Sequence, residues 1–511
     1  MGLVRWGTDC RFPKKQDRDF RDSPFFWREK TFTEYEKCVI IRKTNDNGKD
    51  SLPMCVLEKE KDPGKNIQLL LLLTAGSAAF LLILLDKFFP GTGYFLAEKL
   101  LPVPCLLFAG SALTRRISLP AKGCLLLSGI TVFWFAAVQL QHHLSQMGMS
   151  AFGIFAAGCL LAFPFAAVTG EGDTGLKWLG SVYVAASMLM VLFAGMLLTD
   201  TVPETLAQSI YWDGTRLAAL WHPNVCACVL MIGIGITLFF ILQAKKRWEK
   251  VLLALMTALQ FAAIALTNSR TSILLTCALF GGTLFFGIWK GGWKRFLAGA
   301  AAALAALVVL FALSGFLFDL NTEAQISRLL EQRELGNAVG SDSQTLLVNE
   351  QTGEAIILGN SNQGELMQDM KTLNGRTHIW KAAVTALQDN PPLKIWGTEY
   401  VSIEISSRNY FPVAHAHNSW MQVMMKQGIP GLLLSLVYTV LALWNILVLL
   451  WRPNVALEKK VIAMLVLCIL AASFLEIYLF GSDLNTFFAH YLFFFMLGCL
   501  GCWRRAASSK I

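Results

Sequence analysis

The sequence predicts an all-α protein that crosses a membrane about twelve times. Its 511 residues are 55% hydrophobic, and their mean hydropathy is +0.50, so the chain carries more apolar surface than a soluble protein of this length can bury. Many of its apolar runs reach 18 to 24 residues without interior charge, which is about the length at which a helix crosses the hydrocarbon core. Lipid is therefore expected to be the main solvent of this chain.

The apolar runs define an order of segments along the chain. Residues 1–65 are polar and predict a cytoplasmic extension, residues 66–318 carry nine helices, residues 319–427 form a long outer loop, residues 428–503 carry three more helices, and residues 504–511 are a cytoplasmic tail. The expected spans are residues 67–88, 95–113, 121–140, 149–168, 176–198, 223–243, 250–267, 271–289, 295–318, 428–451, 459–480 and 484–503.

The basic residues predict the orientation of these spans. The net charge of +9 does not indicate nucleic acid, because the Lys and Arg residues cluster at the ends of apolar runs rather than along one face. Short loops on the cytoplasmic side of a membrane protein are enriched in Lys and Arg. Alternate loops here carry clusters at 115–122, 177, 245–250, 290–295, 452–460 and 504–510. Both termini are therefore expected in the cytoplasm, with the 319–427 loop outside.

Composition also argues against several other classes of protein. The first 22 residues lack the apolar core of a signal peptide. The twelve cysteines stand mostly in apolar runs or near the N-terminus and none lies in the outer loop, so a disulfide framework is not expected. No two CxxC motifs occur together, as a four-cysteine zinc site would need. The histidines fall on or near the predicted outer side, which places any proton-transfer chemistry there.

The outer loop is too long for a structureless connection. The stretch TLLVNEQTGEAIIL predicts a hairpin that turns at residues 351–353. A helix is expected from about residue 376 to 387. It would place Ile379, Trp380, Ala383 and Leu387 on one apolar stripe, as in helices that lie on a membrane surface.

Three arginines are candidates for binding an anion. Arg216 and Arg270 stand outside the cytoplasmic clusters, and Arg376 opens the predicted loop helix on the same face as Trp380. A guanidinium near hydrocarbon usually has a partner, and planar guanidinium groups bind phosphate oxygens in pairs, so a diphosphate is the expected ligand. The alternatives are an interfacial arginine, or a salt bridge to an acid such as Asp213 or Glu204.

The stretch PVAHAHNSWMQVMMKQGIPG carries the candidate base. His417 precedes Asn418 at a point where a helix could begin, and a histidine there is suited to take a proton from a hydroxyl at neutral pH. The alternative is a histidine with only a structural role in the loop. His415 and His417 together offer two metal ligands and no third, so no metal site is expected.

Four motifs in order resemble the O-antigen ligase family, which shares a core with O-antigen polymerases. They are HPN at 222–224, LTNSR at 266–270, GRTHIW at 375–380, and AHNSW with QGIPG at 416–431. The segment GTEYVSIE at 397–404 departs from the family, which tends to be richer in glycine there. This departure leaves the shape of the acceptor side open.

The resemblance implies transfer of a preassembled glycan from an undecaprenyl-diphosphate carrier to an acceptor hydroxyl, without a metal, nucleotide sugar or other cofactor. It implies that Arg270 and Arg376 bind the diphosphate with support from Arg216, and that His417 activates the acceptor. His222, Asn224, Trp380 and Asn418 belong to the same motifs and are expected to support the site. The expected partners are the lipid-linked donor, lipid A-core or another glycan acceptor, and membrane lipid, with no nucleic acid.

Two other functions stay open. A polymerase would differ only in its acceptor, a second carrier-linked repeat, and it or a surface-glycan ligase is favoured if the organism has a single membrane. A flippase for lipid-linked oligosaccharides would also span the membrane about a dozen times, but it would show charges deep in several helices and internal repeats. The sequence shows neither.

Overall fold

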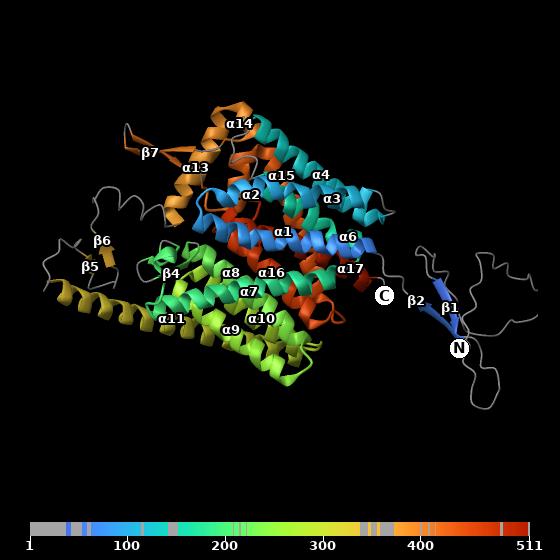
Figure 1. Cartoon of the computed structure of the whole chain (residues 1–511), viewed down its shortest axis with the longest axis horizontal. Helices are drawn as coiled ribbons and strands as arrows, with labels where there is room; N and C mark the ends of the chain where they lie inside the picture. The colour runs from blue at the N-terminus through green and yellow to red at the C-terminus, as the bar shows by residue number, and fades with distance from the viewer. Residues whose placement is uncertain are drawn as a thin grey trace, which may run out of the picture. The chain divides into compact units, whose positions relative to one another are not determined.

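A computed structural model gives the arrangement of the chain (Figure 1). It describes residues 37–41, 54–58, 63–113, 117–141, 152–207, 209–213, 216–220, 222–337, 346–348, 355–357, 373–398, 401–406, 409–413, 415–480 and 484–508. The chain divides into two units, Met1–Pro63 and Gly64–Ile511. In the first unit β1 (Lys37–Ile41) pairs antiparallel with β2 (Met54–Glu58). All that follows concerns the second unit.

The second unit is an all-α bundle, as the sequence predicts. Eleven helices in its described part are long and apolar enough to cross a membrane. The first five spans are formed by α1 (Pro63–Phe88), α2 with α3 (Thr92–Leu100 and Pro102–Leu113), α4 (Leu119–Gln141), the helix over 152–169 that contains η1 (Ala157–Ala162) and α6 (Phe163–Thr169), and α7 (Gly172–Leu198).

The remaining long spans are α8 (Pro223–Gln243), α9 (Arg247–Thr267), α10 (Arg270–Ile288), α11 (Trp293–Asn337), α15 (Ser419–Trp451) and α17 (Leu484–Ser508). One predicted span is shorter than these eleven. It is α16 (Leu457–Ser473), whose 17 residues cover about 25 Å. Almost every α16 residue from Lys460 onward is buried, and the helix packs against α8, α10, α15 and α17.

The helix ends differ most from the expected ones at three places, and one of these differences matters for the site. Instead of running to residue 480, α16 ends at Ser473, so residues 474–480 form an irregular segment. Helix α15 begins at Ser419 rather than 428 and is kinked at Gly428, whose φ is 69°. Helix α11 continues past residue 318 to Asn337. Side chains of residues 474–480 thus become available to line a pocket instead of a helix face.

The core lies around α8 and α17. Aromatic rings of α17 fill the space between neighbouring helices, and the buried ones include Phe487, Phe488, Phe493 and Phe494. Large apolar side chains stay exposed on the outside of the bundle, among them Leu70 of α1, Phe133 of α4 and Val308 of α11. In a membrane this surface faces lipid, so the exposure of leucine and phenylalanine carries no free-energy penalty there.

Short elements cover one end of the bundle. The strands β3 (Ile210–Asp213) and β4 (Arg216–Ala219) form a hairpin beside the start of α8. Between α11 and α15 lie β5 (Leu346–Val348) paired with β6 (Ala355–Ile357), then α13 (Leu373–Asp389), α14 (Pro391–Trp396), and β7 (Val401–Ser406) paired with β8 (Asn409–Val413). The predicted hairpin therefore pairs as expected, and its turn at 351–353 lies outside the described residues.

The predicted loop helix is α13, and its apolar stripe packs on protein. Ile379, Ala383 and Leu387 are buried, and the first two cluster with Met425 of α15. In Figure 1, α13 lies at the end of the bundle from which α11 projects, and the C-terminal end of α17 lies at the other. At that other end Lys459 pairs with Asp173 and lies over the ring of Trp503.

Helix α14 lies against the kink of α15, backbone to backbone. A methyl group added at Gly428 would overlap the carbonyl group of Ile395, and one at Gly397 would overlap the backbone of residues 425–427. The amide of Thr398 donates to the carbonyl of Met425 at 2.6 Å. Glycine is therefore needed at both positions, for the close approach and for positive φ.

We expect Gly428→Ala to destabilise the protein by more than about 1 kcal/mol, because alanine meets both strain and overlap at this position. Thermal unfolding in detergent measures the effect. The control is Gly110→Ala in α3, where an added methyl group meets nothing within 4 Å. Equal unfolding midpoints for the two variants would show that α14 does not lie against the kink.

Candidate functional site

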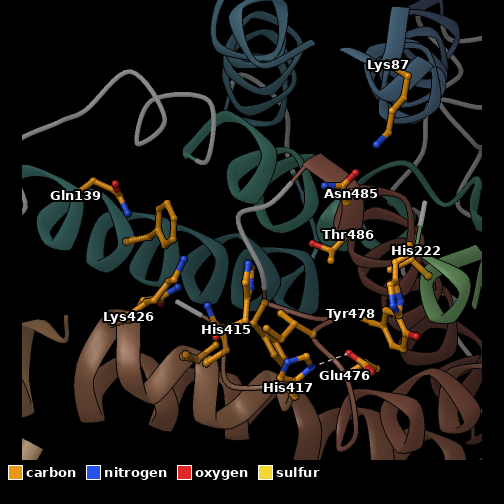
Figure 2. Close-up of a pocket in the computed structure, with 17 residues that line it drawn as sticks. Lys87, Gln139, His222, His415, His417, Lys426, Glu476, Tyr478, Asn485 and Thr486 are labelled. Atoms are coloured by element: carbon orange, nitrogen blue, oxygen red, sulfur yellow. Dashed lines mark hydrogen bonds and ion pairs between the residues drawn. The ribbon is translucent and has the colours of Figure 1, made fainter. Parts of the chain in front are cut away.

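A cavity of about 270 Å³ lies where several helix ends meet. Its walls come from the end of α1, the end of α4, the start of α8, residues 415–427, the segment after α16 and the start of α17. Figure 2 shows ten of the lining side chains by name. The lining residues are Lys87, Phe135, Gln139, His222, Val225, His415, His417, Gln422, Val423, Lys426, Gln427, Glu476, Ile477, Tyr478, Phe480, Asn485 and Thr486.

The cavity is basic. Two lysines and three histidines line it, against the single carboxylate of Glu476. The start of α8 and the start of α17 also border it, and helix N-termini carry positive partial charge. An anionic ligand suits such a cavity better than a cationic one.

Glu476 joins three of the predicted motifs. Its Oε1 accepts hydrogen bonds from Nδ2 of Asn224 at 2.8 Å and from Nη2 of Arg376 at 3.1 Å. Its Oε2 lies 3.4 Å from Nδ1 of His417, as the dashed line in Figure 2 marks. The Glu476 and Arg376 side chains are only 19% and 14% exposed. One half-buried carboxylate therefore ties α8, α13 and the His417 loop together.

Glu476 stays ionised because of these neighbours. Burial by itself raises the pKa of a carboxyl group, but the hydrogen bond and charge of His417, the charge of Arg376 and the amide of Asn224 outweigh burial. The pKa of Glu476 is thus below its ordinary value. An ionised Glu476 favours the tautomer of His417 that donates from Nδ1, which leaves Nε2 with a free electron pair.

Local sequence explains how His417 reaches the cavity. Its φ is 48°, a left-handed conformation that histidine adopts only occasionally. The next residue, Asn418, caps α15 by accepting from the amides of Trp420 and Met421 at 3.0 and 2.9 Å. Asn418 also donates to the carbonyl of Phe474 at 2.9 Å. Asn418 therefore starts α15 and holds the segment that carries Glu476 beside it.

Ser419 binds the same segment by three hydrogen bonds. Its hydroxyl donates to the carbonyl of Glu476 at 3.2 Å and accepts from the amides of Tyr478 and Leu479, both at 3.1 Å. Tyr478 in turn donates to the carbonyl of Asn224 at 2.8 Å. The irregular backbone after α16 thus finds its partners in the AHNSW and HPN motifs.

Arg216 contacts protein groups rather than the cavity. Its Nε donates to the carbonyl of Thr267 at 2.9 Å and its Nη2 to Oδ1 of Asn224 at 2.8 Å. Burial lowers its pKa, while Asp213 and Glu476 act in the opposite direction. Arg216 therefore orients Asn224 and links the HPN motif to the LTNSR motif. His222 caps α8, because its side chain accepts from the amide of Asn224. Its Nε2 lies 3.9 Å from Oδ2 of Asp213.

The other two predicted arginines differ from each other. Arg376 gives Nη1 to the carbonyl of Leu475 and Nη2 to Glu476, and its buried Nε has no hydrogen-bond partner in the described part of the chain. Arg270, at the start of α10, is exposed and forms no ion pair with the described residues. None of the three arginines lines the cavity. Arg270 is the exposed one of the three, so its guanidinium is accessible to an anion from solvent.

Trp380 anchors α13 to the His417 loop. Its indole nitrogen donates to the carbonyl of Ala416 at 2.7 Å, and the amide of Ala416 donates to Gln422 at 2.8 Å. Two residues of the GRTHIW motif thus hold the pair in place. Trp380 binds the residue next to His417, and Arg376 binds Glu476. Within the described ranges, no group of three or more His, Cys, Asp and Glu is placed to hold a metal ion.

Sequence reasoning missed Glu476, Lys87 and Lys426. Glu476 falls within the predicted span 459–480, of which it is the one acidic residue. An acidic residue within an apolar run is costly and usually functional, which is the signal that could have found it. The two lysines stand at helix positions that no motif marks, so only the tertiary structure places them at the cavity.

We expect Glu476→Gln to cost about 1–3 kcal/mol of stability at neutral pH, because it leaves Arg376 without its charged partner. Because the folded pKa is below the unfolded one, this contribution is fully present above the unfolded pKa and is lost as pH falls through the folded pKa. The difference between wild type and Glu476→Gln should therefore shrink below about pH 4 in thermal unfolding experiments. The control is Glu204→Gln, which changes an exposed carboxylate, and a pH-independent difference would contradict the ion pair.

Comparison with known proteins identifies the region around this site. Residues 255–436 match the family model described as O-antigen ligase, and no curated protein matches the chain. The match includes Arg270, Arg376 and His417 but ends before Glu476. The family supports glycan transfer in lipopolysaccharide and O-antigen biosynthesis by a glycosyltransferase-like enzyme. Residues 255–436 of this multi-pass membrane protein are a domain of the O-antigen ligase family.

Proposed function

We propose that this protein transfers a preassembled glycan from an undecaprenyl-diphosphate carrier to an acceptor hydroxyl. The observation that carries the proposal is the pairing of His417 with the ionised Glu476 on the wall of a basic cavity. A histidine oriented by a carboxylate is a general base for a hydroxyl group. The cationic lining suits a diphosphate leaving group.

The transfer step follows from this arrangement. The acceptor oxygen attacks the anomeric carbon of the first sugar of the donor, and the bond from that carbon to the diphosphate oxygen breaks. His417 takes the hydroxyl proton on Nε2, and Glu476 stabilises the imidazolium that results. The electron pair of the broken bond leaves on the carrier diphosphate.

The leaving diphosphate meets positive charge on the donor side. Lys87 lies in the last turn of α1, a helix with exposed apolar side chains, so its ammonium stands where a lipid headgroup would lie. Asn485 and the start of α17 are its neighbours at the cavity (Figure 2). Arg270, exposed at the start of α10, is a second contact in this proposal, with Arg376 and Arg216 shaping the site behind Glu476.

Ligation of O-antigen to lipid A-core is the form of the reaction that we favour, with a polymerase as the second candidate. The matched family is described as O-antigen ligase, which favours the first. The two reactions share a donor and differ in the acceptor. A flippase finds less support, because it would show internal repeats and charges deep in several helices, and the sequence shows neither.

His417→Ala should lower the turnover of purified protein by about 10²–10⁴-fold, the usual contribution of a general base. The assay supplies undecaprenyl-diphosphate glycan and lipid A-core and follows release of the carrier. The turnover of Glu476→Gln should also fall, by a smaller factor, and Glu204→Gln serves as the matched control. Wild-type turnover in a correctly folded His417→Ala variant would remove His417 from the reaction, and replacing lipid A-core by carrier-linked repeats separates ligase from polymerase.

The proposal also requires the cavity to face away from the cytoplasm of a bacterial inner membrane, with both termini inside. A membrane-impermeant maleimide should then label Glu204→Cys in intact spheroplasts and label Glu249→Cys, beside the basic cluster at 245–250, only after lysis. The parent protein gives the background from native cysteines. Labelling of Glu249→Cys before lysis would reverse the orientation.

A further inference from the structure

The cavity has two cationic ends, one on each side of His417. Figure 2 shows Lys87 and Asn485 at the right and Lys426 and Gln139 at the left, with His417 between the two sides and Glu476 below Lys87. A transfer reaction needs a place for two substrates flanking its base. The end with Lys87 has been assigned above to the donor, so the end with Lys426 is available to the acceptor.

The Lys426 end is rich in amide groups. Gln422, Val423, Lys426 and Gln427 are spaced by three and four residues, so they share one face of the first segment of α15. That face lines the cavity, and Gln139 of α4 and His415 line it as well. Amide side chains offer both donors and acceptors, as sugar hydroxyl groups require. The lysine adds a positive charge to this hydroxyl-binding surface.

Two tryptophans pack beside this end of the cavity. The indole of Trp134 stacks on that of Trp396 with ring centroids 5.5 Å apart, and its Nε1 donates to the carbonyl of Gln427 at 3.1 Å. Trp396 belongs to α14, which lies against the kink of α15. The two rings therefore pack against protein next to Lys426 in the chain. The amide and ammonium groups that line this end suit the polar part of a substrate better than a lipid tail.

We propose that Gln422, Lys426, Gln427, Gln139 and His415 form the acceptor subsite, and that the acceptor sugar carries an acidic group which pairs with Lys426. The inference rests on the proposed function and adds the substrate class of its second substrate. The acidic group is a phosphate or a carboxylate near the accepting hydroxyl. An ammonium group binds either as a point charge.

The test varies the acceptor and Lys426 together. With donor at saturation, Lys426→Met should raise KM for lipid A-core about tenfold, which corresponds to ~1.4 kcal/mol of lost binding, and leave KM for the donor within about twofold. For wild type, one of two treatments of the acceptor should raise its KM by a similar factor. The first treatment removes core phosphates with a phosphatase, and the second amidates the carboxylates. The same treatment should cause no further loss with Lys426→Met, since the two changes remove one interaction.

Two controls separate this effect from general damage. Lys381→Met changes an exposed lysine of α13 that does not line the cavity, so it should leave both KM values unchanged. Lys426→Arg keeps the charge and should retain most acceptor affinity. The comparison of treated and untreated acceptors with wild type needs no variant and stands even if Lys426→Met fails to fold.

Several results would overturn the inference. Equal use of treated and untreated acceptors by wild type would show that no acidic group is recognised. A raised donor KM with an unchanged acceptor KM would move Lys426 to the donor side. If wild type transfers glycan to no acceptor, the proposed function fails instead. Binding of glucose 6-phosphate and of glucose to purified wild type and to Lys426→Met then decides whether Lys426 recognises an anionic sugar.

Discussion

The carboxylate of Glu476 is the contact on which the site depends. It receives Asn224 from α8, Arg376 from α13 and His417 from the loop before α15. A partly buried carboxylate without partners would be costly, so each of these groups stabilises the position of the others. The arrangement explains why residues separated by about 250 positions in the chain belong to one site.

The irregular segment after α16 makes this contact possible. Had α16 continued to residue 480, the side chain of Glu476 would have lain on a helix face inside the bundle. The break at Ser473 turns the backbone toward Ser419 and Asn418, which bind it at Phe474, Glu476, Tyr478 and Leu479. The AHNSW motif therefore has a structural task beside its histidine, because its Asn and Ser supply the hydrogen bonds that a helix would otherwise have supplied internally.

The arginines illustrate the difference between residue type and residue role. Arg216 and Arg376 were expected to bind phosphate. Their guanidinium groups instead donate hydrogen bonds to backbone carbonyls and to Asn224 or Glu476. Lysines line the cavity instead, at both ends. A planar group with five donors is well suited to holding several fixed acceptors at once, whereas an ammonium on a flexible stem suits a ligand that must arrive and leave.

By itself, the sequence determined the class of fold, the order of the spans and the motifs that gather at the site. Hydropathy and charge are local properties, so runs such as 223–243 and the helix at 376–387 could be found without any knowledge of neighbours. Tertiary structure decided which side chains meet. It ended α16 early, paired Glu476 with His417 and placed Lys87 and Lys426 on the wall of the same cavity, with His417 between them in Figure 2. These outcomes depend on contacts between distant segments, which no local pattern of residues encodes.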